Sequence, residues 1–321
     1  MTAKILVSDK LSRAGLAILE AAPGVSVDYR PGLSEDALAA AIGDYDALVI
    51  RSGSRVTARV IELGHKLRVI GRAGIGVDNI DVRAAVRRGI VVMNTPTGNA
   101  VTTAEHALSL LLSLTRLIPQ ASASLRAGKW EKNRFEGREI SGKTLGVIGL
   151  GNIGRVVADR AQGLKLHVLG YDPALTAEGA RELGVELVSL EQLFVRSDFI
   201  TLHTPLTPQT RHLLNREAFG KMKPGVMIVN AARGGIVHEG DLEAALREGK
   251  VAGAALDVFE QEPVPADHPL LGLENVIATP HLGASTSEAQ ERVALTIAEQ
   301  VVDFLTTGTV RNSVTVPPAQ Q

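Results

Sequence analysis

The chain has 321 residues, of which 45% are hydrophobic and 21% charged, and it contains no cysteine. Its 34 basic and 35 acidic residues are well mixed and leave a net charge of −1, so nothing in the charge balance indicates a nucleic acid or an anionic membrane as a partner. The absence of cysteine excludes disulfides, thiol nucleophiles and cysteine-bound metals. No signal-peptide pattern opens the sequence and no apolar run is long enough to span a bilayer. We therefore expect a cytoplasmic protein with no metal, nucleic-acid or membrane partner.

The first hundred residues alternate short apolar runs with segments of helical periodicity. Runs such as AKILVS, VSVDY and ALVI are each followed by an amphipathic segment, which predicts a parallel sheet with helices on both faces. The glycine-rich stretch from Gly71 to Gly76 continues into VDNID, a spacing that does not suit a dinucleotide, so we interpret it as a loop that faces a substrate. The helices expected here cover residues 14–21, 35–42, 58–63 and 82–88.

A long amphipathic segment from Thr102 to Trp130 follows, and it is a natural connection between two α/β domains. Pro119 should bend or split this helix, because proline has no N–H to donate inside a helix. Strands and helices then alternate again, so the chain of 321 residues is expected to form two α/β domains. The later helices are expected at residues 176–183, 190–196, 216–221, 240–248 and 287–305.

Residues 141–172 carry the pattern strand, glycine turn, helix, strand and acid. Gly149 permits the tight turn, Gly151 lets backbone amides approach a pyrophosphate, and Gly154 lets the helix lie close to the strand. Asp172 ends the second strand, where its carboxylate would accept hydrogen bonds from the adenosine ribose and repel a 2′-phosphate. The pattern therefore predicts NAD rather than NADP as the cofactor, and the alternative is a structural turn that binds nothing.

Three later strand ends carry side chains that suit a nicotinamide-dependent reaction on an alcohol or keto group. Arg233 follows the run GVMIVNAA, Asp257 ends AALDV shortly before Glu262, and His281 follows NVIATP. An arginine can hold a carboxylate, a histidine can transfer the hydroxyl proton, and a nearby glutamate can orient the histidine. Because open α/β sheets bind ligands at the carboxyl ends of their strands, these positions favour a role in chemistry.

Each candidate also has a plainer interpretation. Arg233 could clamp structural carbonyls, Glu262 could be a solvated loop acid, and His281 could be a loop histidine outside the chemistry. His203, in TLHTPL at another strand end, competes with His281 for the role of the base. His106, in the long connecting helix, is interpreted as a packing or surface residue.

Several motifs in order resemble those of the D-isomer-specific 2-hydroxyacid dehydrogenases: GRAGIGVDNID, the glycine turn, LHTPLT, NAARGGIV, AALDVFEQEP and TPHLGAST. The resemblance covers nearly the whole chain. It implies an α/β fold of two Rossmann-like, doubly wound parallel-sheet domains, of which the substrate domain is discontinuous. The implied boundaries are 1–97 plus 285–321 for the substrate domain and 98–284 for the NAD-binding domain.

The resemblance also implies roles for individual residues. The family's catalytic arginine, glutamate and histidine fall on Arg233, Glu262 and His281, which settles the competition against His203. Asp257 would meet the nicotinamide carboxamide. The implied cofactor-binding residues are Gly149, Gly151, Asn152, Ile153, Gly154, Asp172, Thr204, Ala231, Ala232, Asp257, Gly283 and Ala284. The residues implied for substrate binding are Arg51, Ser52, Arg72, Arg134 and a loop of backbone amides at Gly74, Ile75 and Gly76.

Three arginines indicate which member of the family the chain resembles. Arg51, Arg72 and Arg134 match places where relatives that act on a phosphorylated 2-hydroxy acid gather positive charge. The resemblance also implies a homodimer built around the NAD-binding domains, and Arg134 could act across its interface. The expected function is NAD-dependent oxidation of 3-phospho-D-glycerate to 3-phosphohydroxypyruvate, the first step of serine biosynthesis. The alternatives are a glyoxylate or hydroxypyruvate reductase or another D-2-hydroxyacid dehydrogenase, in which these arginines form ordinary surface ion pairs, and an NAD-sensing co-repressor-like binding module.

Overall fold

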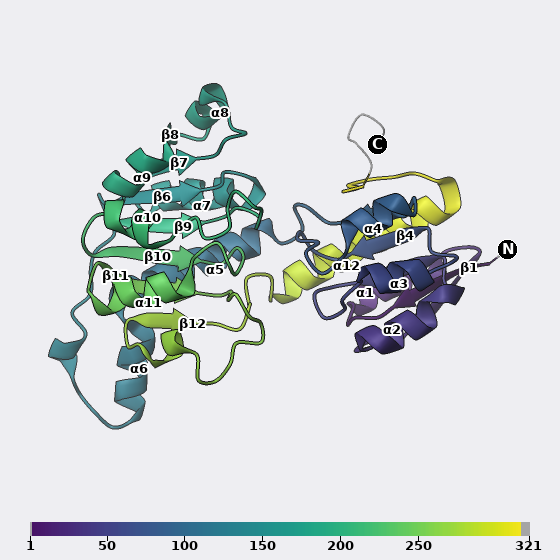
Figure 1. Cartoon of the computed structure of the whole chain (residues 1–321), viewed down its shortest axis with the longest axis horizontal. Coiled ribbons are helices and arrows are strands. Elements are labelled where there is room, and N and C mark those ends of the chain that lie inside the picture. Colours follow the sequence, from purple (N-terminus) through teal and green to yellow (C-terminus); the bar gives the residue numbers. More distant parts are fainter. Residues whose placement is uncertain (1, 316–321) are drawn as a thin grey trace. The chain divides into compact units, whose positions relative to one another are not determined.

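The protein, described here for residues 2–315 of a computed structural model, divides into two compact units (Figure 1). The first unit comprises the residues up to Asn99 together with the segment from Ala284 onward, and the second comprises Ala100–Gly283. Each unit is built on one parallel sheet. The predicted class, α/β with two doubly wound parallel sheets, is therefore confirmed. Among the described residues, no helix is both long and apolar enough to cross a membrane.

The first unit has helices on both faces of a five-stranded sheet. Its strands are β1 (Ala3–Val7), β2 (Val25–Tyr29), β3 (Ala47–Ile50), β4 (Val69–Arg72) and β5 (Val91–Met93), in the order β2-β1-β3-β4-β5. Its helices are α1 (Arg13–Ala21), α2 (Glu35–Ala41), α3 (Ala58–Leu63), α4 (Val82–Arg87) and α12 (Ser287–Thr307), with the 3-10 turn η1 (Ile42–Asp44).

Alternate residues of the strands supply the two halves of this unit's core, as the period of two in a strand requires. Leu6 and Leu48 face α2, α3 and α4. Ile5 and Val69 face the opposite side, where α12 packs. A Cβ atom at Gly71 would lie 2.6 Å from Val301 Cγ2, so only glycine lets α12 approach β4 this closely. A helix from the end of the chain thus completes the core of the N-terminal unit.

The second unit has a seven-stranded parallel sheet in the order β12-β11-β10-β9-β6-β7-β8. Its strands are β6 (Thr144–Ile148), β7 (His167–Tyr171), β8 (Glu186–Leu187), β9 (Phe199–Leu202), β10 (Val226–Asn230), β11 (Val251–Leu256) and β12 (Val276–Ala278). Its longer helices are α5 (Ala100–Arg116), α6 (Ile118–Arg126), α7 (Asn152–Gly163), α8 (Ala177–Glu182), α9 (Leu190–Arg196), α10 (Arg216–Lys221) and α11 (Glu239–Arg247). The 3-10 turns are η2 (Lys132–Arg134) and η3 (Pro269–Gly272).

The order of these strands reverses beside β6. The chain first proceeds from β6 to β7 and β8 on one side, and then returns to place β9, β10, β11 and β12 on the other. Such a switch point is where open α/β sheets bind dinucleotides, because the loops on either side of it diverge. The core beneath α5 and α7 and the core beneath α9, α10 and α11 cover the two faces of the sheet.

Side-chain caps mark where many helices begin. Each cap accepts a hydrogen bond from the backbone N–H three residues later, and each is worth about 1 kcal/mol because it satisfies a donor that the first helical turn leaves unpaired. The capping residues include Ser12, Ser34, Asp81, Thr176, Ser189, Asn215 and Thr286.

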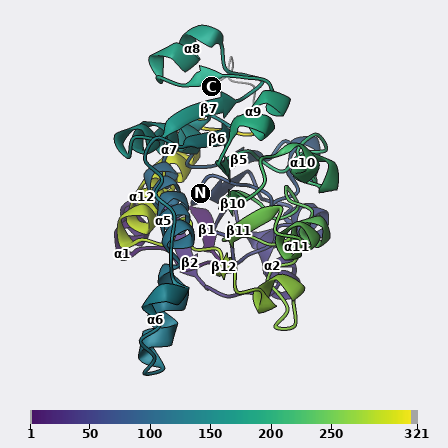
Figure 2. The same cartoon turned by 90° about the vertical axis from the view of Figure 1, so that its left-hand side faces the viewer.

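The long connecting segment is split, as predicted. Helix α5 ends at Arg116, Leu117 adopts a left-handed conformation with φ of 54°, and Pro119 lies in the first turn of α6. Proline is tolerated in a first turn because the N–H that it lacks would have no intrahelical partner there. Helix α6 buries none of its residues. It begins an arm, residues 118–130, that projects from the second unit (Figure 2).

Candidate active site

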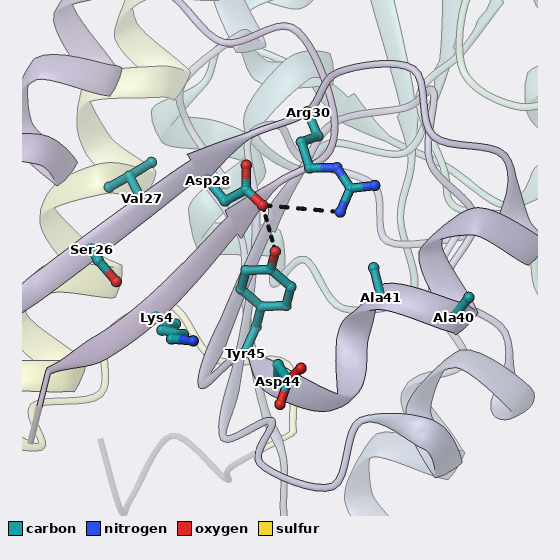
Figure 3. Close-up of a pocket in the computed structure, with 9 residues that line it drawn as sticks. All are labelled: Lys4, Ser26, Val27, Asp28, Arg30, Ala40, Ala41, Asp44 and Tyr45. Atoms are coloured by element: carbon teal, nitrogen blue, oxygen red, sulfur yellow. Dashed lines mark hydrogen bonds and ion pairs between the residues drawn. The ribbon is translucent and has the colours of Figure 1, made fainter.

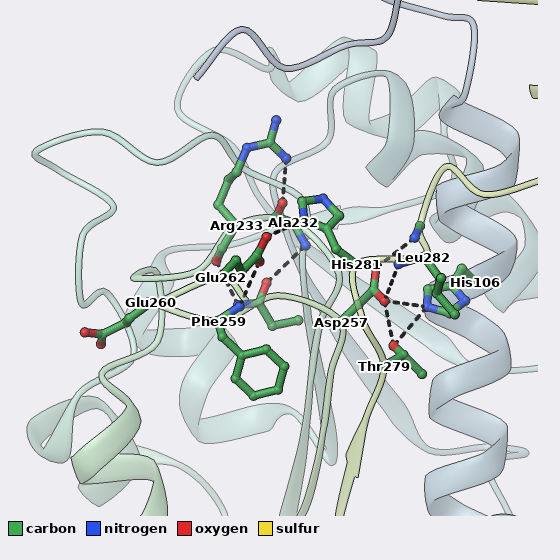
Figure 4. Close-up of polar contacts among 12 residues, drawn as sticks. His106, Ala232, Arg233, Asp257, Phe259, Glu260, Glu262, Thr279, His281 and Leu282 are labelled. Carbon is green, nitrogen blue, oxygen red and sulfur yellow. Dashed lines mark hydrogen bonds and ion pairs between the residues drawn. The ribbon is translucent and has the colours of Figure 1, made fainter. Parts of the chain in front are cut away.

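Three neighbouring strands of the second unit end in residues predicted to be functional. Arg233 follows β10, Asp257 follows β11 and His281 follows β12, while Glu262 lies in the loop after β11. Since β10, β11 and β12 are adjacent and parallel, their carboxyl ends form one edge. Figure 4 shows the imidazole of His281 and the carboxylate of Glu262 pointing toward each other, with Arg233 coming from the β10 end.

A short polar contact at this edge joins His281 to Glu262. The distance from His281 Nδ1 to Glu262 Oε2 is 2.7 Å, and the two side chains are 48% and 38% exposed. Because a carboxylate only accepts hydrogen bonds, Nδ1 must carry the proton. In the neutral imidazole, Nε2 therefore keeps a lone pair and can act as a base.

The other carboxylate oxygen of Glu262 binds the backbone of the loop in which Glu262 lies. Glu262 Oε1 accepts a hydrogen bond of 3.1 Å from the backbone N–H of Phe259. Burial alone would raise the pKa of the Glu262 carboxyl, but the hydrogen bond and charge of His281, together with the Phe259 N–H, hold this pKa below its usual value. Glu262 is therefore ionised at neutral pH, as a partner for a protonated imidazole must be.

The turn that carries Arg233 is organised by the last residue of β10. Asn230 Oδ1 accepts from Ala232 N–H at 3.1 Å, and Asn230 Nδ2 donates to Arg233 O at 2.9 Å. Arg233 Nη1 donates to Ala232 O at 2.6 Å, which orients the guanidinium. A Cβ at Gly234 would lie 1.8 Å from Phe259 O, so this turn packs directly against the loop of Glu262. The structuring role of Asn230 was not predicted, although the residue stands in the NAARGG motif.

The structure corrects the sequence-based interpretation of His106, which placed this residue among packing or surface residues. Its side chain is 20% exposed, and Nε2 lies 3.1 Å from Oδ1 of the fully buried Asp257 carboxylate. Thr279, the residue before Pro280, also donates to this oxygen. No local pattern could have indicated these contacts, because His106 lies on α5, far from Asp257 in the chain.

His203, the competing base, is in a different environment. It is hydrogen-bonded through Nε2 to Thr201 Oγ1 at 2.9 Å, and no ion pair with a carboxylate is found for it among the described residues. Burial lowers the pKa of His203 to about 3, so the ring stays neutral. A histidine that cannot be stabilised as an imidazolium is poorly suited to take and hold a proton.

The glycine turn after β6 has the geometry that a dinucleotide requires. Gly149 has φ of 92°, and a Cβ there would lie 2.5 Å from His203 O. A Cβ at Gly154 would lie 1.9 Å from Gly149 O, whereas one at Gly151 would meet nothing within 4 Å. The two outer glycines thus permit close packing, and Gly151 leaves open space at the N-terminus of α7, where a pyrophosphate would meet backbone amides. The residues present fit NAD.

Asp172 supports the same turn from the end of β7. Its Oδ2 accepts from Leu150 N–H at 2.7 Å and its Oδ1 from Ala174 N–H at 2.9 Å. Each carboxylate oxygen can accept a second hydrogen bond, so the ribose hydroxyls would still find acceptors.

The other predicted cofactor residues lie mostly at the same edge of this sheet. Asn152 and Ile153 begin α7, Thr204 follows β9, and Gly283 belongs to the turn after β12. Ala231 and Ala232 are buried in the turn after β10. Ala284, by contrast, begins the second segment of the first unit.

In the first unit, the predicted substrate residues follow two neighbouring strands. Arg51 and Ser52 come after β3, while Arg72 ends β4. Asp9 holds the first of these loops, since its Oδ2 accepts from Arg51 N–H at 2.6 Å. Arg72 Nη1 donates to Ala73 O at 3.3 Å.

The loop after β4 presents backbone donors. Asn94 Nδ2 donates to Ile75 O at 2.6 Å, and Thr95 N–H donates to Gly74 O at 3.0 Å, so the carbonyls are occupied. Within residues 2–315, the N–H groups of Gly74, Ile75 and Gly76 donate to no protein group. Successive amides of this kind form a concave anion-binding surface.

Arg134 lies in the second unit, in η2. Its guanidinium forms ion pairs with Glu274 at 3.0 Å and Glu131 at 3.4 Å, and its side chain is 49% exposed. Exposed pairs of this kind contribute little to stability, because water screens the two charges. In the single chain, Arg134 thus forms surface ion pairs, as its alternative interpretation expects. Its role in binding a substrate stays a prediction.

A hollow of about 370 Å³ lies elsewhere in the first unit, beside β2 and α2 (Figure 3). It is lined by charged and polar side chains, among them Lys4, Asp28, Arg30 and Tyr45, and Tyr45 donates to Asp28 at 2.5 Å. None of the predicted site residues lines it.

The fold, the glycine turn at the switch point and the side chains at the strand ends define a dinucleotide-binding α/β protein. Residues 108–283 match the family described as "D-isomer specific 2-hydroxyacid dehydrogenase, NAD binding domain". The chain belongs to this family, as its motifs predicted, and the matched residues lie within its second unit.

Three comparisons illustrate the relationship. The chain is 51% identical to the D-3-phosphoglycerate dehydrogenase of Methanocaldococcus jannaschii over 99% of its length, but it spans only 60% of that relative. The TT0316 protein of Thermus thermophilus is 35% identical, with a TM-score of 0.89 over 97% of this chain and 99% of that one. A glyoxylate reductase from Paecilomyes thermophila is 30% identical, with a TM-score of 0.90 over 100% of this chain and 99% of that one.

Proposed function

We propose that the protein is a cytoplasmic enzyme that oxidises 3-phospho-D-glycerate to 3-phosphohydroxypyruvate with NAD, the first step of serine biosynthesis. The observation that carries the chemistry is the 2.7 Å contact between His281 Nδ1 and Glu262 Oε2, at the strand edge that also presents Arg233. The 51% identity to an archaeal D-3-phosphoglycerate dehydrogenase favours this substrate within the family.

The reaction removes a proton from the substrate hydroxyl and a hydride from the carbon that bears it. His281 Nε2 takes the proton, because Nδ1 already carries one and donates it to Glu262. The ionised Glu262 stabilises the imidazolium that results. Arg233 binds the substrate carboxylate through two parallel hydrogen bonds and stabilises the developing carbonyl. NAD, when bound, supplies the acceptor for the hydride.

The first unit would recognise the acid and its phosphate. The N–H groups of Gly74, Ile75 and Gly76 suit a carboxylate, since they have no protein partner among the described residues. Arg51 and Arg72, at the ends of neighbouring strands, add the positive charge that a phosphate requires.

The test is the initial rate of NADH formation with 3-phospho-D-glycerate, compared with D-glycerate and D-lactate, with hydrazine present to trap the keto product. We expect kcat/KM to favour the phosphorylated acid by at least about tenfold, because one charge-assisted contact is worth about 1.5–3 kcal/mol. Equal or better rates with the unphosphorylated acids would reject the substrate but keep the dehydrogenase chemistry. The similarity to a glyoxylate reductase makes glyoxylate and hydroxypyruvate, with NADH, the second pair of substrates to measure.

We also propose that two copies of the chain form a dimer through the arm that begins with α6. The arm exposes three large apolar side chains, Ile118 at 52%, Leu125 at 58% and Trp130 at 83%. Apolar side chains gathered on one projecting segment favour burial against another surface, and a second copy offers the same arm in return.

Light scattering after size exclusion should therefore give about twice the 33.9 kDa mass of the chain, as a two-fold assembly requires. The double change Leu125→Glu with Trp130→Glu should give the monomer mass, because a charged side chain is costly to bury. Val195→Glu is the matched control, since Val195 is also exposed, at 54%, but lies on α9. A monomer mass for the unaltered chain would refute the dimer.

A further inference from the structure

The carboxylate of Asp257, for which the resemblance implies a contact with the cofactor, accepts hydrogen bonds from several groups of the protein itself. Its Oδ1 accepts from Thr279 Oγ1 at 2.6 Å and from Leu282 N–H at 2.7 Å, and its Oδ2 accepts from Gly283 N–H at 2.8 Å. Its side chain is fully buried. Burial raises the pKa of the Asp257 carboxyl, but the donors around it, His106 first among them, lower this pKa below its usual value. Asp257 is therefore ionised.

These bonds define the path of the turn that carries His281. The N–H of His281 donates to Asp257 O at 2.9 Å and to Thr279 O at 3.0 Å, so three consecutive amides, from 281 to 283, bind Asp257 through its backbone or its side chain. His281 has φ of 54°, a left-handed conformation that costs energy for a residue with a side chain. Asp257 thus holds the turn, and with it the imidazole of His281, in a conformation that the chain would not prefer alone.

His106 reaches the same oxygen from the other side. Its Nε2 lies 3.1 Å from Asp257 Oδ1 and 3.4 Å from Thr279 Oγ1 (Figure 4). The Thr279 hydroxyl already donates its hydrogen to Asp257, and the ionised carboxylate can only accept. Both neighbours of Nε2 are therefore acceptors, so Nε2 must carry a proton and donate it.

We propose that His106 is a positioning residue for the base His281. It donates a hydrogen bond from α5 to the buried Asp257 carboxylate, and so fixes the oxygens that bind the amides of Leu282 and Gly283. Removal of this donor leaves Asp257 with one partner fewer in a site closed to water, and the carboxylate then shifts to recover hydrogen bonds. Because the turn follows the carboxylate, His281 moves relative to Glu262. This proposal rests on the proposed function, in which His281 is the base.

The experiment compares two substitutions of the same residue. His106→Leu removes the donor but keeps an apolar side chain of similar size, whereas His106→Gln returns an N–H donor to about the place of Nε2. His167→Leu is the control, because His167 is an exposed histidine at the start of β7. For each variant, we would measure kcat, the KM values for NAD and 3-phosphoglycerate, and hydrogen–deuterium exchange of a peptide that covers the turn at residues 281–283.

We expect His106→Leu to lower kcat by about tenfold or more, since small misplacements of a reacting group are costly, while both KM values change less than about threefold. Its turn should exchange faster. His106→Gln should regain most of the loss in both measurements, and the control should match the unaltered chain. If His106→Leu leaves both kcat and the exchange rate of the turn unchanged, the proposal is overturned. A loss that His106→Gln does not recover would also overturn it, since His106 would then act by packing alone.

Two further measurements keep the outcomes separable. If His106→Leu does not fold, His106→Asn replaces it, because the shorter amide keeps a polar side chain but does not reach Asp257. His281→Ala is assayed in parallel: if it keeps normal turnover, the proposed function fails. The exchange of the turn then still decides whether His106 holds it, so the two failures are distinguishable.

Discussion

His281→Ala should lower kcat by about a thousandfold, because general base catalysis by a positioned side chain typically contributes about 10²- to 10⁴-fold. The variant keeps Glu262, Arg233 and the glycine turn, so the affinity for NADH should change little. Initial rates give kcat, and the fluorescence of bound NADH gives the affinity. The large expected loss follows from the geometry: at the edge formed by β10, β11 and β12, the ring of His281 lies 2.7 Å from the carboxylate of Glu262, which prepares its other nitrogen to act as the base.

His167→Ala is the matched control for this change, since it removes an exposed imidazole from β7, away from the turn. It should show the turnover of the unaltered chain. Normal turnover in His281→Ala would remove His281 from the mechanism and return it to its plainer interpretation as a loop histidine. A loss of NADH binding together with turnover would instead indicate that the variant has lost the cofactor site.

Arg233→Lys should lower kcat/KM for the hydroxy acid by about a hundredfold, although the positive charge is kept. A planar guanidinium donates two parallel hydrogen bonds to a carboxylate, and a single ammonium cannot reproduce both. Lysine would also lose the bond from Nη1 to Ala232 O that orients the side chain of residue 233. The measurement is kcat and KM for the acid at saturating NAD.

The control for Arg233→Lys is Arg216→Lys, on the exposed face of α10, where the arginine side chain is 78% exposed. This change should leave both kinetic constants as they are. Unchanged turnover and unchanged substrate affinity in Arg233→Lys would reject the two-pronged grip and leave Arg233 as a clamp for structural carbonyls.

Local patterns were sufficient for most of the elements and for much of the candidate site. Apolar runs of four to six residues between amphipathic segments predicted the parallel strands, because a strand covered on both faces must be apolar throughout. The spacing of Gly149, Gly151 and Gly154 predicted the dinucleotide turn, because each position needs the room that a missing side chain leaves. The residues after β10, β11 and β12 were candidates because ligands bind where parallel strands end.

Periodicity could not predict which surfaces pack together. The amphipathic pattern of residues 287–305 predicted a helix, but its apolar face would have suited either sheet, and only the family resemblance implied that it returns to the first. His106 was misinterpreted for the same reason. A helical pattern shows which face of α5 is buried, whereas the partner of one side chain on that face depends on the strand that folding brings beside it.

Sequence was therefore enough for the strands, the helices and the glycine turn, and it made Arg233, Glu262 and His281 candidates for the chemistry, since these depend on residues close together in the chain or on the ends of predicted strands. The contact of Glu262 with His281, the turn organised by Asp257 and the hydrogen bond from His106 became known only with the folded chain. Each joins side chains from separate elements, and their distances are set by how the helices and strands pack, which no local spacing in the sequence encodes.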